Sequence, residues 1–291
     1  MIVRIAAVQY LLRQINDWDG FENQVRFIMK SAGDYKPHFV LLPEIFTTQL
    51  LSFMDTTDVS KAVRNLHHYT DQYKALMQEM ATTWNVHLIA GSHPTLKEGR
   101  LLNTAYYFTP GGEVFEHDKI HRTRWEREKW NTDAGDHLNL FDTPFGKIAI
   151  LICYDIEFPE LSRMVSEAGA DILMVPSCTD DRQGFLRVRY CCHARAIENQ
   201  VFVAMTSTVG NLPVEGLGLN YGQASIITPS DFSFARDGLA AEGTPNIEQI
   251  VVADVDLNDL LSNRENGTTI PLYDKRKDIY ENPVQVISVA G

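Results

Sequence analysis

The chain has few cysteines, and their positions argue against a scaffold held together by disulfides. Among 291 residues, the only cysteines are Cys153, Cys178, Cys191 and Cys192. The last two are adjacent, which is a poor geometry for a disulfide. The group also lacks the paired Cys-x-x-Cys spacing of a zinc site, even with His193 included. We therefore expect no metal and a reducing, cytoplasmic location.

Long apolar runs and an excess of positive charge are also missing. The longest apolar runs, such as residues 148–153, are far shorter than the roughly 20 residues that cross a bilayer. The net charge of −12 argues against general binding of phosphate backbones, which requires clustered Lys and Arg. The N-terminus, MIVRIAAVQY, is typical of a strand and lacks the pattern of a signal peptide. We expect neither a membrane nor a nucleic acid as a partner.

The composition is that of a globular chain, with 44% hydrophobic and 22% charged residues. No repeat of fixed period occurs, which excludes solenoids and propellers. No shift of composition marks a linker, so we predict one continuous domain over residues 1–262. The polar segment 263–291, with Pro271 and Pro283, is predicted to be an arm that packs on the body or on a partner subunit.

Apolar strands alternate with amphipathic helices along most of the chain, which predicts an α/β fold. Pro110-Gly111-Gly112 separates two strands as a hairpin signal, so the sheets should be mixed. The predicted strands are 3–9, 39–42, 86–90, 103–108, 113–118, 147–152, 171–175, 201–205, 223–228 and 249–255. The predicted helices are 20–32, 69–84, 159–168, 186–199 and 256–261, the last capped by Asp256.

A reactive polar residue directly follows an apolar strand in three places, at Glu44, Lys119 and Cys153. The ends of strands are where α/β folds usually assemble their sites. Taken singly, these residues are ordinary: a loop carboxylate, a surface lysine and a buried thiol. Together they form a complete set for acyl transfer, because a carboxylate can activate a thiol and an ammonium can stabilise the oxyanion.

The same segments resemble the signature motifs of the nitrilase superfamily of carbon–nitrogen hydrolases, whose triad is Glu-Lys-Cys in this chain order. The resemblance covers most of the chain. The matching motifs are residues 5–9, Pro43-Glu44, Lys119-Ile120-His121, Cys153-Tyr154-Asp155 with residues 158–161, residues 169–173, residues 195–199, and Asp254-Val255-Asp256.

The resemblance implies a four-layer α/β/β/α sandwich of two mixed sheets. It also implies an assembly of at least two copies, a homodimer or a higher homo-oligomer. By the same resemblance, Cys153 is the nucleophile, Glu44 is the general base and Lys119 stabilises the oxyanion. The backbone amide of Tyr154 would be the second oxyanion donor. No metal or organic cofactor is implied, because every reacting group belongs to the protein.

Many members of the family carry a second glutamate that positions the substrate and the lysine. It lies a fixed distance before a turn such as Gly135-Asp136. Glu128 fits that spacing best, and Glu126 is the alternative.

The residues after the nucleophile favour an amidase over a nitrilase. Relatives that cleave nitriles typically have Trp-Glu there, whereas those that cleave amides or carbamoyl groups often have Tyr-Asp, as in Tyr154-Asp155. We expect a hydrolase that acts on a small amide or carbamoyl substrate through a thioester. Two alternatives stay open: a catalytically silent binding or scaffold protein, and an acyltransferase that uses the same triad. The presence of all three triad residues favours activity.

The loop 177–184 departs from the family pattern, because it is charged where relatives commonly have small, apolar or aromatic residues. By resemblance this loop lines the substrate pocket, which suggests a polar or charged substrate. Arg182 could bind a substrate carboxylate through its planar fork of N–H groups, as could Arg187 or Arg189. An Asp–Arg network that only fixes the loop explains the pattern equally well.

Overall fold

The N-terminal strand β1 (Ile2–Leu12) is central to the computed structural model, which describes residues 1–280 and 282–288. Because successive side chains of a strand point to opposite faces, β1 contributes to two separate cores. Val3 and Ile5 pack into the cluster between the two halves of the sheet. Ala6 and Val8 face the opposite way and pack under helices. One short apolar segment therefore holds both layers together.

The strands form one curled sheet within the described residues, in the order β5-β4-β3-β2-β1-β9-β8-β7-β6. Residues 2–9 of β1 pair antiparallel with β12, and Ile5–Ala7 pair parallel with β2. Residues 10–12 then pair parallel with β9, so β1 passes from one half of the sheet to the other.

The first half contains β2 (Phe39–Leu41), β3 (His87–Lys97), β4 (Arg100–Phe108), β5 (Val114–Asp118) and β12 (Gln249–Asp256). The second half contains β6 (Leu140–Thr143), β7 (Gly146–Ile150), β8 (Ile172–Ser177), β9 (Phe202–Gly210), β10 (Ser225–Ile227) and β11 (Leu239–Glu242).

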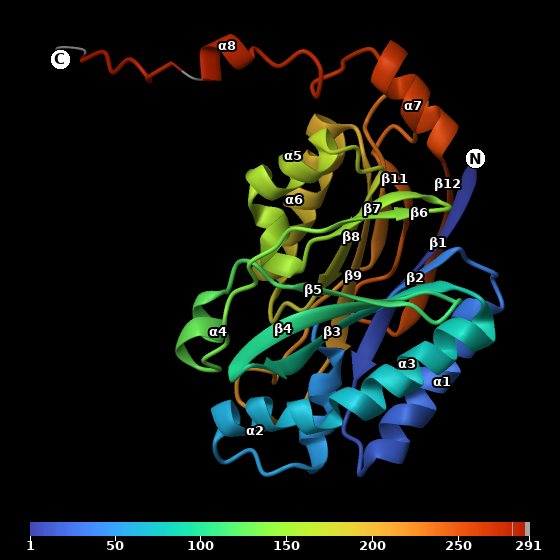
Figure 1. Ribbon diagram of the computed structural model, residues 1–291, viewed down its shortest axis with the longest axis vertical. Coiled ribbons are helices and arrows are strands. Elements are labelled where there is room, and N and C mark those ends of the chain that lie inside the picture. The colour runs from blue at the N-terminus through green and yellow to red at the C-terminus, as the bar shows by residue number, and fades with distance from the viewer. Residues whose placement is uncertain (281, 289–291) are drawn as a thin grey trace.

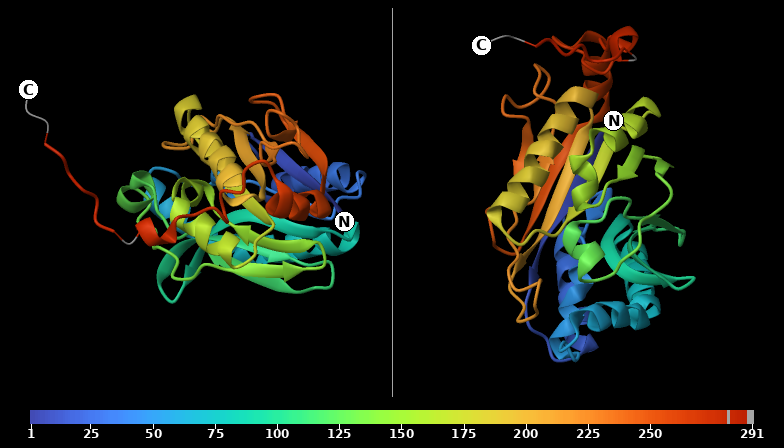
Figure 2. Two further views of the ribbon diagram at one scale, coloured as in Figure 1. Left: turned by 90° about the horizontal axis from the view of Figure 1, so that it is seen from above. Right: turned by 90° about the vertical axis from the view of Figure 1, so that its left-hand side faces the viewer.

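Helices cover the outer face of each half (Figures 1 and 2). Helices α1 (Trp18–Gly33) and α3 (Thr70–Trp84) lie on the first half, and α5 (Pro159–Glu167) and α6 (Arg182–Asn199) lie on the second. The predicted four-layer α/β/β/α sandwich is confirmed. The two predicted sheets are, however, the two halves of a single hydrogen-bonded sheet, because β1 joins them.

The structure adds several short elements that the pattern did not predict. These are α2 (Val59–Asn65), α4 (Arg124–Glu128) and the 3-10 helices η1 (Phe46–Phe53), η2 (Leu66–Tyr69) and η3 (Cys153–Glu157). Helix α6 also begins four residues before its predicted start, because the Asp181 carboxylate accepts the Gly184 amide at 2.6 Å and caps the helix there.

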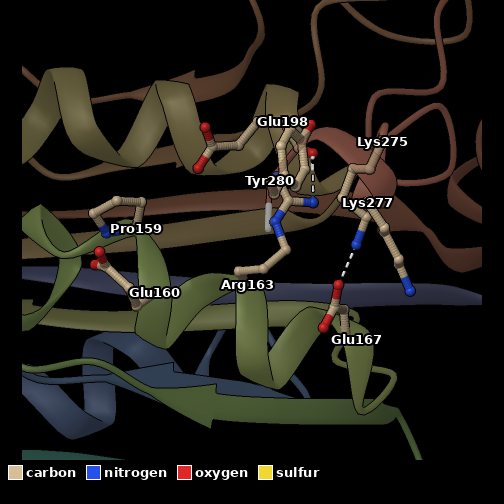
Figure 3. Close-up of a pocket in the computed structure, with 8 residues that line it drawn as sticks. All are labelled: Pro159, Glu160, Arg163, Glu167, Glu198, Lys275, Lys277 and Tyr280. Carbon is tan, nitrogen blue, oxygen red and sulfur yellow. Dashed lines mark hydrogen bonds and ion pairs between the residues drawn. The ribbon is translucent and has the colours of Figure 1, made fainter. Parts of the chain in front are cut away.

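The C-terminal segment is anchored to the body by side chains of α7 (Leu257–Asn266) and of the residues that follow it. Helix α7 crosses the predicted boundary at residue 262, and its Arg264 donates to the Asp171 carboxylate and to the Ala170 carbonyl oxygen. Lys275 pairs with Glu167 of α5 at the edge of a groove between α5 and the arm (Figure 3). After α8 (Lys277–Tyr280), residues 282–288 run away from the body (Figure 1). Packing of the arm on a partner subunit, like the homodimer, stays a prediction.

No helix among the described residues is long and apolar enough to cross a membrane.

A fully buried histidine lies beneath α3. His93 contacts the hydroxyl groups of Thr47 and Thr70 through its two ring nitrogens and stacks on Tyr73. Burial lowers the pKa of His93 from 6.5 to about 3. The folded state therefore keeps this ring neutral at pH values where the unfolded chain would protonate it.

We predict that His93 makes folding less favourable as the pH falls below 6.5. Between that value and about 3, the unfolded state binds a proton that the folded state does not. Each pH unit in this window therefore lowers the free energy of unfolding by about 1.4 kcal/mol. Urea unfolding of His93→Gln should show a shallower loss between pH 6.5 and 4.5 than the wild type. The exposed His68→Gln is the control, and equal slopes for all three proteins would contradict the prediction.

Candidate active site

A tight turn after β2 places Glu44 in the interior. Gly91 passes directly beneath this turn with φ of +64°, and a Cβ at that position would collide with the Pro43 carbonyl oxygen. The next residue, Ser92, accepts the backbone amide of Ile45 at 3.0 Å. Because only glycine permits this close approach, the Gly91-Ser92 pair holds the buried Glu44 carboxylate in place.

Lys119 follows β5, and two hydrogen bonds fix the position of its backbone. Its amide donates to the Asn103 carbonyl oxygen at 2.9 Å, and its carbonyl oxygen accepts the Gly135 amide at 2.7 Å. The Lys119 ammonium is only 2% exposed. It donates to Oε1 of Glu44 at 2.7 Å and to both carboxylate oxygens of Glu126 at 2.9 Å. All three N–H groups of the ammonium are therefore used.

The glutamate that contacts Lys119 is Glu126 and not Glu128, which corrects the expectation from spacing. Glu126 is the third residue of α4 and forms a capping box with Thr123, so its side chain turns back into the protein. Glu128 lies two positions further along the helix and therefore faces away. It is 53% exposed and pairs with Arg124 at 2.8 Å. The sequence Thr123-x-x-Glu126 was the local signal that distinguishes the two.

Cys153 is the first residue of η3, in a strained turn that follows β7. Its φ of +48° is in the left-handed region, which is unfavourable for a residue with a side chain. The thiol is buried and donates to the Cys178 carbonyl oxygen at a distance of 3.7 Å. Asp155, two residues later, accepts the backbone amides of Ile120 and His121 at 3.3 and 2.7 Å. This buried carboxylate ties the turn of Cys153 to the segment that carries Lys119.

Cys178, at the end of β8, completes the network, because its amide donates to Oε2 of Glu44 at 2.9 Å. The ends of β2, β5, β7 and β8 therefore meet at one point. Burial raises the pKa of the Glu44 carboxyl, although Lys119 opposes this change. Burial and the adjacent Glu44 raise the pKa of the Cys153 thiol well above its ordinary value. The resting site therefore holds a neutral thiol beside a carboxyl group of weakened acidity.

The other two ionisable groups of the cluster have stabilised charges. Burial alone would lower the pKa of Lys119, but Glu126 and Glu44 outweigh it and raise the pKa well above its ordinary value. Burial alone would raise the pKa of Glu126, but Lys119 and further hydrogen bonds lower it. The site therefore favours the charged forms of Lys119 and Glu126.

A cavity of about 340 Å³ opens onto Glu44, Lys119 and Cys153, within the usual size range of small-molecule sites. A second hollow of about 350 Å³ shares Cys153 with it and extends to Tyr154 and Glu157. The first cavity is also lined by Arg124, Trp125, Trp130, Cys178, Asp180, Arg187, Leu217, Leu219 and Asn220. The reactive groups therefore share one cavity with aromatic and charged side chains.

The structure separates the three arginines proposed to bind a substrate carboxylate. Arg182 is exposed in the first turn of α6 and lines a neighbouring hollow that Cys153 does not reach. Arg189 donates to Gln223 and Glu242. Arg187 lines both cavities that contain Cys153. Arg187 is thus the one of the three arginines that lines the cavity with Glu44, Lys119 and Cys153, and a role of Arg182 in substrate binding stays a prediction.

Two further contacts had no local signal in the sequence. Asn103 donates to Glu44 and Glu126 from within β4, and Cys178 contributes through its backbone. The Tyr154 ring packs edge-on against Phe158, and its amide as an oxyanion donor stays a prediction. Among the described residues, no cluster of three or more His, Cys, Asp or Glu side chains could hold a metal ion.

Comparisons with known proteins give consistent results. Residues 4–265 match the family model described as carbon-nitrogen hydrolase. The chain is 48% identical over 279 residues to the probable hydrolase YhcX of Bacillus subtilis, covering 96% of this chain and 54% of that protein. It thus spans about half the length of that relative. It is 30% identical over 293 residues to the omega-amidase NIT2 of Danio rerio, covering 97% and 98% of the two chains.

A solved structure shares the fold. The carbon-nitrogen hydrolase from Helicobacter pylori G27 superposes with a TM-score of 0.80 at 21% identity, and the match covers 96% of this chain and 97% of that one.

We predict that the two glutamates of α4 differ sharply in their contribution to stability. Glu126→Gln removes a buried partner of Lys119 and should lower the free energy of unfolding by about 2 kcal/mol. Glu128→Gln removes an exposed partner and should change it by less than about 0.5 kcal/mol. Urea unfolding at pH 7 measures both variants, and equal effects would show that Glu126 is not the buried partner.

Proposed function

The chain belongs to the carbon–nitrogen hydrolase family, and we propose that it hydrolyses a small amide or carbamoyl compound through a thioester on Cys153. The observation that carries the proposal is the meeting of Glu44, Lys119 and Cys153 at one cavity. The family membership and the naming of one relative as an omega-amidase give further support.

In the first half of the proposed reaction, the Cys153 sulfur attacks the substrate carbonyl carbon. Because the pKa of both groups is raised, the thiol gives up its proton only as the new bond forms, and Glu44 is able to receive it. The tetrahedral oxyanion is stabilised by the Lys119 ammonium and the Tyr154 amide. Glu44 then returns the proton to the leaving nitrogen, and the C–N bond breaks to give the thioester and an amine or ammonia.

In the second half, water replaces the departed amine. Glu44 takes a proton from the water, whose oxygen attacks the thioester carbon. When this second oxyanion collapses, the C–S bond breaks, Glu44 returns the proton to the Cys153 sulfur and the acid is released. All three N–H groups of Lys119 are used by the two glutamates at rest. To stabilise each oxyanion, one of them must therefore be shared between a glutamate oxygen and the oxyanion. Glu126 accepts two of them, so it can yield one without releasing the lysine.

We further propose that the substrate carries a carboxylate at the end remote from the scissile bond. Arg187 lines the cavity, and its side chain is 65% exposed. Its contact with Glu157 is 3.8 Å long, beyond hydrogen-bond distance, which leaves its N–H groups available. The guanidinium can therefore bind a carboxylate through two parallel hydrogen bonds. This favours monoamides of dicarboxylic acids and carbamoyl amino acids over simple aliphatic amides.

We predict that Cys153→Ala abolishes the release of ammonia from a panel of amides, carbamoyl compounds and nitriles. The variant loses the sulfur that forms the proposed thioester, whereas its folding should be unchanged by circular dichroism. Cys191→Ala is the matched control, because that half-buried thiol lies outside the cavity. Turnover by Cys153→Ala at the rate of the wild type would contradict the thioester mechanism. Release of ammonia from nitriles alone would contradict the assignment as an amidase.

We predict that Arg187→Ala lowers kcat/KM about 10- to 100-fold for the monoamide of a five-carbon dicarboxylic acid. The reason is the loss of a charge-assisted hydrogen bond to the substrate carboxylate. For pentanamide, which has no carboxylate, the variant should match the wild type. Arg182→Ala, which alters an arginine outside the cavity, is the control. An equal loss on both substrates would assign Arg187 to structure instead of specificity.

A further inference from the structure

We propose that Asn103 is a positioning residue that holds Glu44 ionised and correctly oriented as the general base, an inference that rests on the proposed function. Asn103 lies on β4 and is 4% exposed. Its Nδ2 donates to Oε1 of Glu44 at 2.9 Å and to Oε1 of Glu126 at 3.2 Å. Its carbonyl oxygen accepts the amide of Lys119 at 2.9 Å. One residue thus contacts three members of the charged cluster.

The orientation of the Asn103 amide is determined by the two carboxylates. The opposite orientation would turn Oδ1 toward two negatively charged oxygens and leave both carboxylates without this donor. In the orientation present, Oδ1 is buried and has no hydrogen-bond partner within the part of the chain that the structure describes. A buried acceptor without a partner is unfavourable. The Asn103 side chain therefore donates to both carboxylates, while its own oxygen is without a hydrogen-bond partner among the described residues.

The charges of the cluster explain why this donor is needed. Two buried carboxylates share a single ammonium, which leaves one negative charge uncompensated in an environment of low polarity. The Asn103 amide presents partial positive charge to both carboxylates without adding a formal charge. A cation in its place would lower the basicity of Glu44 further. An amide is thus suited to hold Glu44 ionised while it can still accept a proton.

Asn103 does not line the cavity, so it acts through Glu44 and not on the substrate. Loss of its hydrogen bond should disfavour the ionised form of Glu44. The reactivity of the Cys153 thiol depends on Glu44 as proton acceptor. The low-pH limb of the curve that plots the reaction rate of the Cys153 thiol against pH should therefore shift to higher pH when Asn103 is replaced. A purely structural residue would change stability and leave this limb where it is.

The experiment measures the rate at which iodoacetamide alkylates Cys153 between pH 4 and 9, with the modified peptide identified by mass spectrometry. The variants are Asn103→Asp, which keeps the shape but replaces the donor by an acceptor, and Asn103→Leu, which removes both polar atoms. The matched control is Asn263→Asp. Asn263 is equally buried and donates to the Asp231 carboxylate at 2.8 Å, but on α7 and outside the cluster.

We expect the low-pH limb of alkylation to move upward by about one pH unit in both Asn103 variants. At pH values on that limb, the rate would then fall about tenfold. Asn263→Asp should lose thermal stability and keep the wild-type profile. Superimposable profiles for the wild type and any Asn103 variant that remains folded would overturn the inference.

The same data separate this inference from the proposed function. A wild-type enzyme that releases ammonia from no compound of the panel would contradict the proposed function, while the alkylation profiles would still test Asn103. Conversely, turnover of an amide with an unmoved limb in the Asn103 variants would leave the proposed function standing and refute the role of Asn103.

Discussion

The structure depends on a buried ammonium shared by two carboxylates. Removing Lys119, Glu44 and Glu126 from water is costly, and their mutual attraction alone does not offset the cost. Additional N–H groups from Asn103, Cys178 and Thr123 complete the coordination of the carboxylate oxygens. Because these donors come from distant parts of the sequence, the cluster can form only when the ends of several strands meet.

The fold brings those ends together through β1. This strand belongs to both halves of the sheet, so the two halves pack face to face. The ends of β2 and β5 from the first half then lie next to the ends of β7 and β8 from the second half. Asp155 then links the turn of Cys153 to the segment of Lys119. The reactive groups are thus fixed by backbone geometry.

Much of this arrangement could be predicted from the sequence, because strand patterns and the order of motifs are local features. Glu44, Lys119 and Cys153 each follow an apolar strand, and the structure brings all three to one cavity. The finer details depended on helix register. The start of α4 determines which glutamate contacts Lys119, and the start of α6 determines which arginine lines the cavity with Cys153. Helix α4 was not predicted and α6 was predicted to start four residues late, although Thr123 and Asp181 mark both starts as caps.

The pairing of β1 with β12 has a consequence for folding. Ile2 lies opposite Asp256, so β1 completes the hydrogen bonds of this edge only when a strand about 250 residues away in the sequence has reached it. Until then one edge of β1 is an open template, apolar on both faces, of the kind that pairs with other chains and promotes aggregation. Folding intermediates in which β12 has not yet paired are therefore the ones most exposed to misassembly.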